Sequence, residues 1–104
     1  MSDKKYILRY LPIFAEDLSK AVRYISKSLN NPTAAQKLAD DTEKAILKRL
    51  ESPLAFSPYR SLNSRKHRYY RINVGNFSVF YVVIDNVMEV RRFIYSKRDI
   101  DNFI

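Results

Sequence analysis

Basic side chains gather in two places in the second half of the chain. The stretch 60–71 contains five Lys or Arg residues and no acid, and Lys97 and Arg98 form a further pair near the C-terminus. Arginine binds phosphate with a planar fork of N–H donors and keeps its charge. The whole sequence holds 19 Lys and Arg against 11 Asp and Glu, a formal net charge of +8. This charge attracts polyanions, and its clustering favours a binding surface over a general aid to solubility.

Several residues in or near these stretches are candidates for nucleic-acid contacts. His67 lies between Lys66 and Arg68, so a phosphate contact or plain exposure is favoured over acid–base catalysis. Tyr95 lies beside the basic pair and can stack on a base, although an aromatic residue on a strand can equally belong to the core. The expected contacts are Arg60, Arg65, Lys66, His67, Arg68, Arg92 and Tyr95. The alternative is that the basic loop is simply solvated or is covered by an acidic partner.

The composition excludes several classes of protein. One His, no Cys and no group of acids at ligand spacing argue against a metal site, and no motif indicates a cofactor. No apolar run approaches the roughly 20 residues that cross a bilayer, and the charged N-terminus does not have the pattern of a signal peptide. The 104 residues suffice for one domain. We therefore expect a single cytoplasmic domain over residues 1–104 that does not bind membranes.

Apolar periodicity predicts two helices after a short first strand. Residues 5–11 read as a strand and end at Pro12, which suits the first turn of a helix. Asn31 and Pro32 are expected to cap and begin the second helix, and Asp17 is placed on the solvent side of the first. The stripes expected to face the core are Phe14, Leu18, Ala21, Val22, Ile25 and Leu29, and Ala35, Leu38, Thr42, Ala45, Ile46 and Leu50. The short break between the helices predicts an antiparallel hairpin.

In the remaining chain, apolar and polar residues alternate as they do in β-strands. An irregular connector at 52–63 leads to expected strands at 69–74, 77–84 and 87–95, and Asn and Asp residues mark the two turns between them. The order β-α-α-β-β-β predicts an α+β fold in which the helical hairpin covers one face of a small, mainly antiparallel twisted sheet. We expect the first strand to join the sheet beside the meander. The other sheet face is expected to be open and flanked by the basic residues.

Three segments in this order carry a resemblance to a known family. Residues 17–25, with the Asn-Pro-x-Ala-Ala turn at 31–35, are similar to that family's helical hairpin. Residues 70–85 are similar to its central β-hairpin, and residues 91–100 to its final strand and trailing basic turn. Together they resemble the RelE/ParE superfamily of toxins from type II toxin–antitoxin modules. The resemblance implies a cognate antitoxin, whose acidic segment would cover the basic face.

The superfamily contains two kinds of toxin. RelE-like members are ribosome-dependent mRNA endoribonucleases, whereas ParE-like members poison DNA gyrase and need no catalytic groups. Arg71 matches a basic position typical of the nucleases, and the Lys97-Arg98 pair matches their basic turn. Asn73 and Ser78 stand where further basic residues are typical, and the chain ends in Phe-Ile where the nucleases have a Tyr. The Asn-Pro turn of the long hairpin is typical of ParE-like proteins.

The nuclease resemblance implies catalytic roles for three residues. Metal-independent RNA cleavage aligns the 2′-hydroxyl on the adjacent phosphate, removes its proton and stabilises the charged phosphorane. Arg71 and Arg98 suit the last task, and Lys97 can assist, since a lysine beside other cations can serve as a base. The alternative is that Lys97 and Arg98 are an exposed tail paired with Asp99 and Asp101.

Three functions stay open on the sequence alone. The leading interpretation is a toxin that cleaves mRNA on the ribosome, the alternative is a non-enzymatic poison of DNA gyrase, and the third is a basic nucleic-acid-binding module outside any toxin pair.

Overall fold

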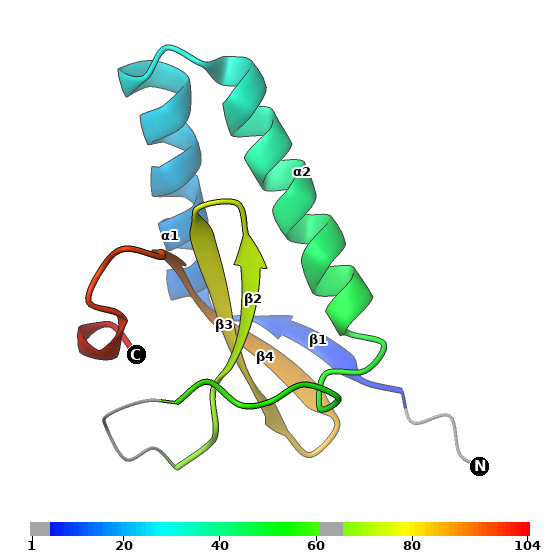
Figure 1. Cartoon of the computed structure of the whole chain (residues 1–104). Coiled ribbons are helices and arrows are strands. Elements are labelled where there is room, and N and C mark those ends of the chain that lie inside the picture. The colour runs from blue at the N-terminus through cyan, green and yellow to red at the C-terminus, as the bar shows by residue number, and fades with distance from the viewer. Residues whose placement is uncertain (1–4, 61–65) are drawn as a thin grey trace.

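The computed structural model describes residues 5–60 and 66–104 and places a helical hairpin against a four-stranded sheet (Figure 1). The elements are β1 (Ile7–Tyr10), α1 (Pro12–Arg23), α2 (Pro32–Arg49), β2 (Tyr70–Val74), β3 (Phe77–Ile84) and β4 (Val87–Tyr95). A π-helical turn (Tyr24–Ser28) continues α1, and a 3-10 turn (Ile100–Asn102) follows β4. The expected α+β fold is confirmed. Over the described residues, no helix has both the length and the apolar character needed to cross a membrane.

Local signals fix where both helices begin. Pro12 and Pro32 occupy the first turns of α1 and α2, where their missing N–H groups are not needed. Asn31 caps α2, because its Oδ1 accepts a hydrogen bond from the Ala34 N–H at 3.0 Å. Both starts agree with the sequence prediction.

The end of the first helix differs from the prediction. An uninterrupted α-helix to residue 29 would place Leu29 one turn beyond Ile25 on the buried stripe. In the structure the Leu29 N–H donates to the Tyr24 carbonyl oxygen at 3.1 Å, which closes a wider π turn. This turn holds an extra residue and shifts the register, so that the Leu29 side chain is 56% exposed. Leu29 therefore lies outside the core.

The sheet has the strand order β1-β4-β3-β2. Strands β2, β3 and β4 form the expected antiparallel meander, and β1 joins β4 in parallel beside it, as expected. A β-bulge in β4 leaves Arg91 as the extra residue between Val90 and Arg92.

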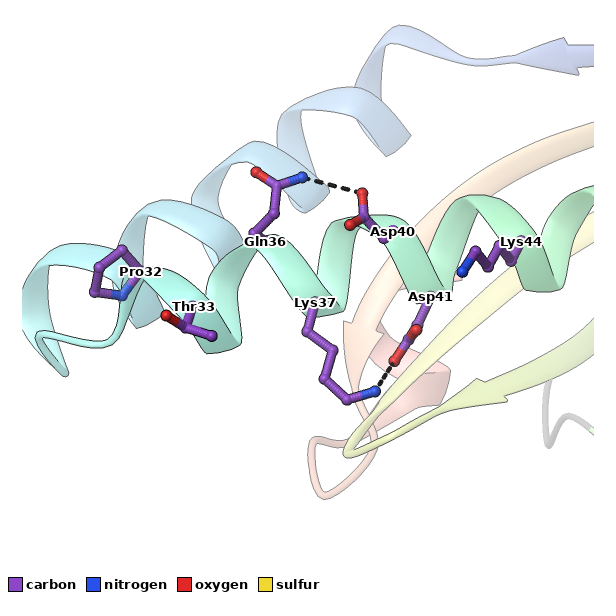
Figure 2. Close-up of a pocket in the computed structure, with 7 residues that line it drawn as sticks. All are labelled: Pro32, Thr33, Gln36, Lys37, Asp40, Asp41 and Lys44. Atoms are coloured by element: carbon purple, nitrogen blue, oxygen red, sulfur yellow. Dashed lines mark hydrogen bonds and ion pairs between the residues drawn. The ribbon is translucent and has the colours of Figure 1, made fainter.

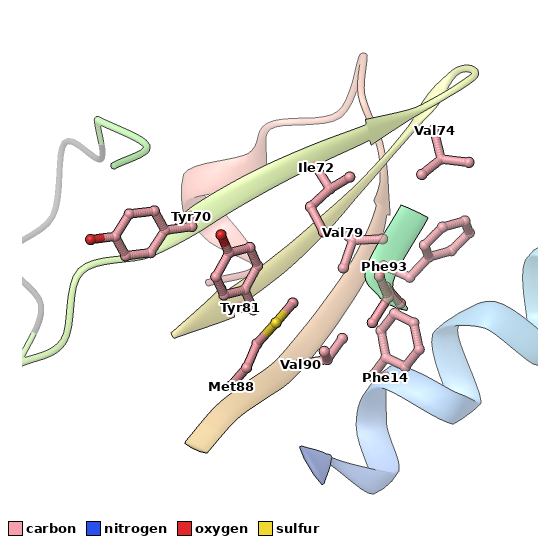
Figure 3. Close-up of a cluster of buried hydrophobic side chains, with 10 residues drawn as sticks. Phe14, Tyr70, Ile72, Val74, Val79, Tyr81, Met88, Val90 and Phe93 are labelled. Carbon is pink, nitrogen blue, oxygen red and sulfur yellow. The ribbon is translucent and has the colours of Figure 1, made fainter. Parts of the chain in front are cut away.

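The helical hairpin covers one face of this sheet (Figure 1), and the side chains between them form the main core (Figure 3). Phe14 from α1 and Ile46 from α2 meet apolar side chains from the three meander strands. The Phe14 ring stacks on Tyr10 at a centroid distance of 5.4 Å and meets the edge of Phe93 at 6.0 Å. The other buried members of this cluster are Tyr70, Ile72, Val74, Val79, Tyr81, Met88 and Val90.

The opposite sheet face is not open. Tyr59 from the connector and Ile100, Phe103 and Ile104 from the C-terminal segment pack over a second apolar cluster. The sheet residues of that cluster are Phe80, Val82, Ile84 and Ile94. The expectation of an uncovered face is wrong, because short irregular segments on either side of the meander carry apolar side chains that shield it from water.

An ion pair joins α1 to β4 and to the C-terminal segment. The Asp17 carboxylate accepts hydrogen bonds from Arg92 Nε at 2.7 Å and Nη2 at 3.1 Å, and from the Phe93 N–H at 3.1 Å. Arg92 Nη1 donates to the Phe103 carbonyl oxygen at 2.7 Å. Asp17 therefore does not lie on the solvent side of its helix. Because β1 pairs with β4 only as far as Val90, the carboxylate takes the place of a strand partner for the Phe93 N–H.

Candidate functional site

Polar side chains meet on the sheet face opposite the helices, near the end of the β2–β3 hairpin. Arg71 Nε donates to Ser78 Oγ at 2.8 Å, and Ser78 Oγ lies 2.8 Å from Ser96 Oγ in the turn after β4. Asn73 Oδ1 lies 3.3 Å from the same Ser78 hydroxyl, which is fully buried. We call Arg71, Asn73, Ser78 and Ser96 the hairpin cluster. It brings Arg71 next to the start of the basic turn, as the nuclease interpretation requires.

The two cations of the basic turn directly follow the last residue of the hairpin cluster. Lys97 and Arg98 are exposed, and the Arg98 guanidinium lies 5.5 Å from the centroid of the Phe103 ring. The Asp99 carboxylate accepts a hydrogen bond from Asn102 Nδ2 at 2.6 Å. Both cations thus face solvent and can meet an anionic partner.

The hairpin cluster contains no group that titrates near neutral pH. Arginine stays charged, and serine and asparagine do not ionise in this range. Tyr59 lies beside the cluster, with its ring centroid 5.7 Å from the Arg71 guanidinium carbon. Burial and the charge of Asp101 raise the pKa of this phenol more than Arg71 lowers it, so the phenol is protonated at neutral pH. The cluster can therefore bind an anion through Arg71 but supplies no general base of its own.

Tyr81 holds the connector that leads into the basic stretch. Its buried hydroxyl donates to the Pro53 carbonyl oxygen at 2.7 Å and accepts from Arg49 Nη1 at 3.0 Å. Burial raises the pKa of Tyr81 more than the Arg49 hydrogen bond lowers it, which keeps this donor protonated. Arg49 also donates to the Arg71 carbonyl oxygen at 3.3 Å and stacks on Phe56, 3.6 Å from the ring centroid. These contacts tie α2, the connector and β2 together.

The residues expected in the basic loop are only partly described. Arg60, Lys66 and Arg68 are exposed, and His67 is half-buried. Arg65 lies outside the described residues. The exposed cations stay candidates for contact with a polyanion.

Two other residues that were expected to contact nucleic acid lie outside the hairpin cluster. Arg92 donates from all three guanidinium nitrogens, to Asp17 and to the Phe103 carbonyl oxygen, so its role is to hold the fold together. The Tyr95 ring packs edge-on against Phe77 at 5.5 Å, on the sheet face that carries the helices. The cluster lies on the opposite face.

A second polar cluster fastens the edge strand β1. The buried Glu89 carboxylate accepts hydrogen bonds from Arg9 Nη1 at 3.2 Å and from Arg91 Nε at 2.9 Å. Arg91 Nη1 donates in turn to the Tyr69 hydroxyl at 3.3 Å. Burial raises the pKa of Glu89, but the hydrogen bonds and charges of Arg91 and Arg9 lower it by more, so the pKa lies below its ordinary value of 4.5.

This lowered pKa predicts how the stability depends on pH. A carboxyl group whose pKa is lower in the folded than in the unfolded state stabilises the fold above the unfolded pKa, and that contribution is lost as the pH falls through the folded pKa. The free energy of unfolding should therefore decrease as the pH is lowered below 4.5, the ordinary pKa of this carboxyl group. Glu89→Gln should make this decrease less steep. Urea denaturation across the acid range measures it, with Glu16→Gln, an exposed site, as the control. A wild-type slope in Glu89→Gln would contradict the prediction.

A shallow hollow on the outer side of α2 is lined by that helix alone (Figure 2). Gln36 donates to Asp40 at 3.0 Å and Lys37 to Asp41 at 2.8 Å, which are ordinary pairs along a helix face. In residues 5–60 and 66–104, no three His, Cys, Asp or Glu side chains are placed to hold a metal ion together. The hollow offers no reactive group beyond these pairs and contains no member of the hairpin cluster.

Sequence reasoning missed Ser96 and Tyr59 as parts of the site. Ser96 directly precedes Lys97, and that adjacency was the available signal. Tyr59 carried no such signal, because its place beside Arg71 depends on how the irregular connector folds back.

Comparison with known proteins agrees with the fold and the sequence pattern. The model of the family described as "ParE toxin of type II toxin-antitoxin system, parDE" matches residues 8–100. A chain of the chromosomal ParDE system from P. aeruginosa has a similar structure, with a TM-score of 0.70 and 19% identity over 92% of this chain and 100% of that one. A chain of the E. coli DinJ-YafQ complex is similar at a TM-score of 0.53 and 16% identity, over 88% of this chain and 93% of that one. None of the curated proteins matches the sequence.

The family match spans nearly the whole described fold, from β1 to the 3-10 turn after β4. It removes the third interpretation, a basic nucleic-acid-binding module outside any toxin pair. The chain belongs to the ParE toxin family within the RelE/ParE superfamily and is the toxin of a type II toxin–antitoxin system.

Proposed function

We propose that this toxin acts as a non-enzymatic poison of DNA gyrase in the cytoplasm and is held inactive by its cognate antitoxin. The observation that carries the proposal is the make-up of the hairpin cluster. At the place where a nuclease would need groups that move protons, the cluster has an arginine, an asparagine and two serines joined by hydrogen bonds of 2.8 to 3.3 Å. A toxin that works by binding needs no such groups.

Two features of the site weigh against RNA cleavage. Ser78, which stands at a position typical of a basic residue in the nucleases, is fully buried and cannot reach a phosphate. Phe103 covers the second apolar cluster near the C-terminus and has no hydroxyl to donate a proton. The hairpin cluster therefore does not itself supply the acid–base pair from which general acid–base catalysis typically gains about 10²–10⁴-fold in rate.

Ribosome-dependent mRNA cleavage stays the second candidate because Arg71 lies next to the turn that carries Lys97 and Arg98. Arg71 and Arg98 would then hold the reacting phosphate, with Lys97 assisting. Under this alternative, Arg98→Ala would abolish growth arrest without unfolding the protein, because an exposed arginine after a strand contributes little to the core.

The proposed antitoxin contact is the basic surface that includes Arg60, Lys66 and Arg68. An acidic peptide segment complements this charge, and it would compete there with any nucleic acid.

The test of the proposed function compares two activities of the same purified protein. We expect inhibition of gyrase supercoiling, with trapped cleavage complexes, and no new ends by primer extension on a message translated by ribosomes. If gyrase supercoiling is unaffected and the mRNA is cleaved only when ribosomes translate it, the proposal is overturned and the second candidate is established.

A further inference from the structure

The outer end of the helical hairpin is polarised in charge. Figure 1 shows the connection between α1 and α2 projecting away from the sheet. Residues 18–39, which form this end, contain four Lys or Arg residues and no acid. The acids of the two helices are Glu16, Asp17, Asp40, Asp41 and Glu43, all nearer the sheet end of the hairpin. This outer end of the helical hairpin therefore presents positive charge.

Two large apolar side chains are exposed at this positively charged end of the helical hairpin. Tyr24 is 57% exposed and Leu29 is 56% exposed. The π turn exposes Leu29, because a regular helix would place that side chain on the apolar stripe that includes Ile25. A local departure from the packing rule that exposes an apolar group is typical of a functional surface.

The cations next to these two side chains have no carboxylate partner in the described part of the helical hairpin. Arg23 donates to Ser19 Oγ at 3.2 Å, and neither Arg23 nor Lys27 forms an ion pair with a carboxylate of the described chain. Each of the other two cations has a carboxylate partner one turn away: Lys20 lies 3.5 Å from Glu16 and Lys37 lies 2.8 Å from Asp41. We call Arg23, Tyr24, Lys27 and Leu29 the hairpin tip.

We propose that the hairpin tip is the surface with which the toxin docks on its protein target, in an apolar socket that is rimmed by acidic side chains. The inference rests on the proposed function and adds the place of contact. Tyrosine, arginine and large apolar residues carry most of the binding energy in protein interfaces. The phosphate backbone of a nucleic acid would satisfy Arg23 and Lys27 but offers no apolar surface to Leu29. The charge of the tip complements an acidic rim.

The experiment measures inhibition of gyrase supercoiling by tip variants. Tyr24→Ala with Leu29→Ser should raise the half-inhibitory concentration about 30-fold, which corresponds to the loss of about 2 kcal/mol of binding energy. Leu47→Ser, at a leucine of α2 that is 48% exposed, is the matched control and should act as the wild type does. Arg23→Glu with Lys27→Glu should also weaken inhibition, more than the equal charge change of Lys44→Glu with Lys48→Glu. Thermal unfolding should be unchanged throughout, since all the substituted side chains are exposed.

The outcomes separate this inference from the proposed function. If the wild type inhibits gyrase and the tip variants inhibit it equally well, the tip is not the docking surface and the proposed function stands. If the wild type does not act on gyrase, the proposed function fails, and growth arrest after induction then tests the hairpin tip. Loss of growth arrest in Tyr24→Ala with Leu29→Ser supports the tip as the docking surface. Full growth arrest in that variant overturns the inference. Tip variants that lose affinity for a labelled DNA duplex, with gyrase contact intact, would assign the tip to nucleic acid and overturn the inference.

Discussion

Truncation of Phe14 to alanine is expected to lower the free energy of unfolding by about 3–5 kcal/mol. Phe14 is 3% exposed and inserts from α1 between the helical hairpin and the sheet (Figure 3). Its ring touches Tyr10 from β1 and Phe93 from β4, so its removal leaves a cavity where three elements meet. A loss of this size is a large part of the 5–15 kcal/mol that stabilises a typical domain.

Urea denaturation of Phe14→Ala against wild type measures the effect. Ile13→Ala is the control, because its side chain is 42% exposed and should change stability by no more than about 0.5 kcal/mol. Should Phe14→Ala fail to fold, Phe14→Leu provides a measurable variant with an intermediate loss. Equal midpoints for Phe14→Ala and Ile13→Ala would show that this ring does not hold the hairpin to the sheet.

The helices were predictable because their signals are local. Asn31 and Pro32 mark the start of α2 by cap chemistry that acts over a few residues. The exception is the end of α1, where the apolar period indicated a buried Leu29. A π turn is one extra residue in a helical run, and the sequence carries no breaker before Asn30 that would reveal it.

The covering of the second sheet face could not be predicted from periodicity. Tyr59, Ile100 and Phe103 lie in short irregular segments, and no repeat of two or 3.6 residues assigns them to a face. Their packing onto this face is a long-range effect, because an exposed cluster around Phe80 and Val82 would leave a large apolar surface in water. In place of the expected open face flanked by basic residues, the structure has arginines that lie against aromatic rings, such as Arg71 beside Tyr59.

Part of the candidate site could be predicted from the sequence. Charge and the nuclease resemblance indicate Arg71 and the Lys97-Arg98 turn, and the hairpin cluster links Arg71 through Ser78 to Ser96, the residue before Lys97. That link depends on the register of β2, β3 and β4, which the pattern of apolar residues does not specify to one residue. The pairing of Arg92 with Asp17 could not be predicted, because the two residues are 75 positions apart in the chain.

This distant pair supports the second large prediction. Asp17→Ala should lower the free energy of unfolding by about 3 kcal/mol, because it leaves the guanidinium of Arg92, whose side chain is only 19% exposed, without its counter-ion. It also removes the acceptor of the Phe93 N–H at the edge of β4. The C-terminal segment should loosen as well, since the same guanidinium holds the Phe103 carbonyl oxygen at 2.7 Å.

A double-mutant cycle identifies the cause of that loss. Asp17→Ala with Arg92→Ala should cost less than the sum of the single changes, because the double variant leaves no partly buried charge without a partner. Glu16→Ala is the control on the neighbouring residue: its pair with Lys20 is exposed and should contribute less than about 1 kcal/mol. Additive losses in the cycle would mean that Asp17 and Arg92 stabilise the fold independently. In that case the Phe93 N–H, and not the ion pair, would be the contact through which Asp17 holds α1 to the sheet.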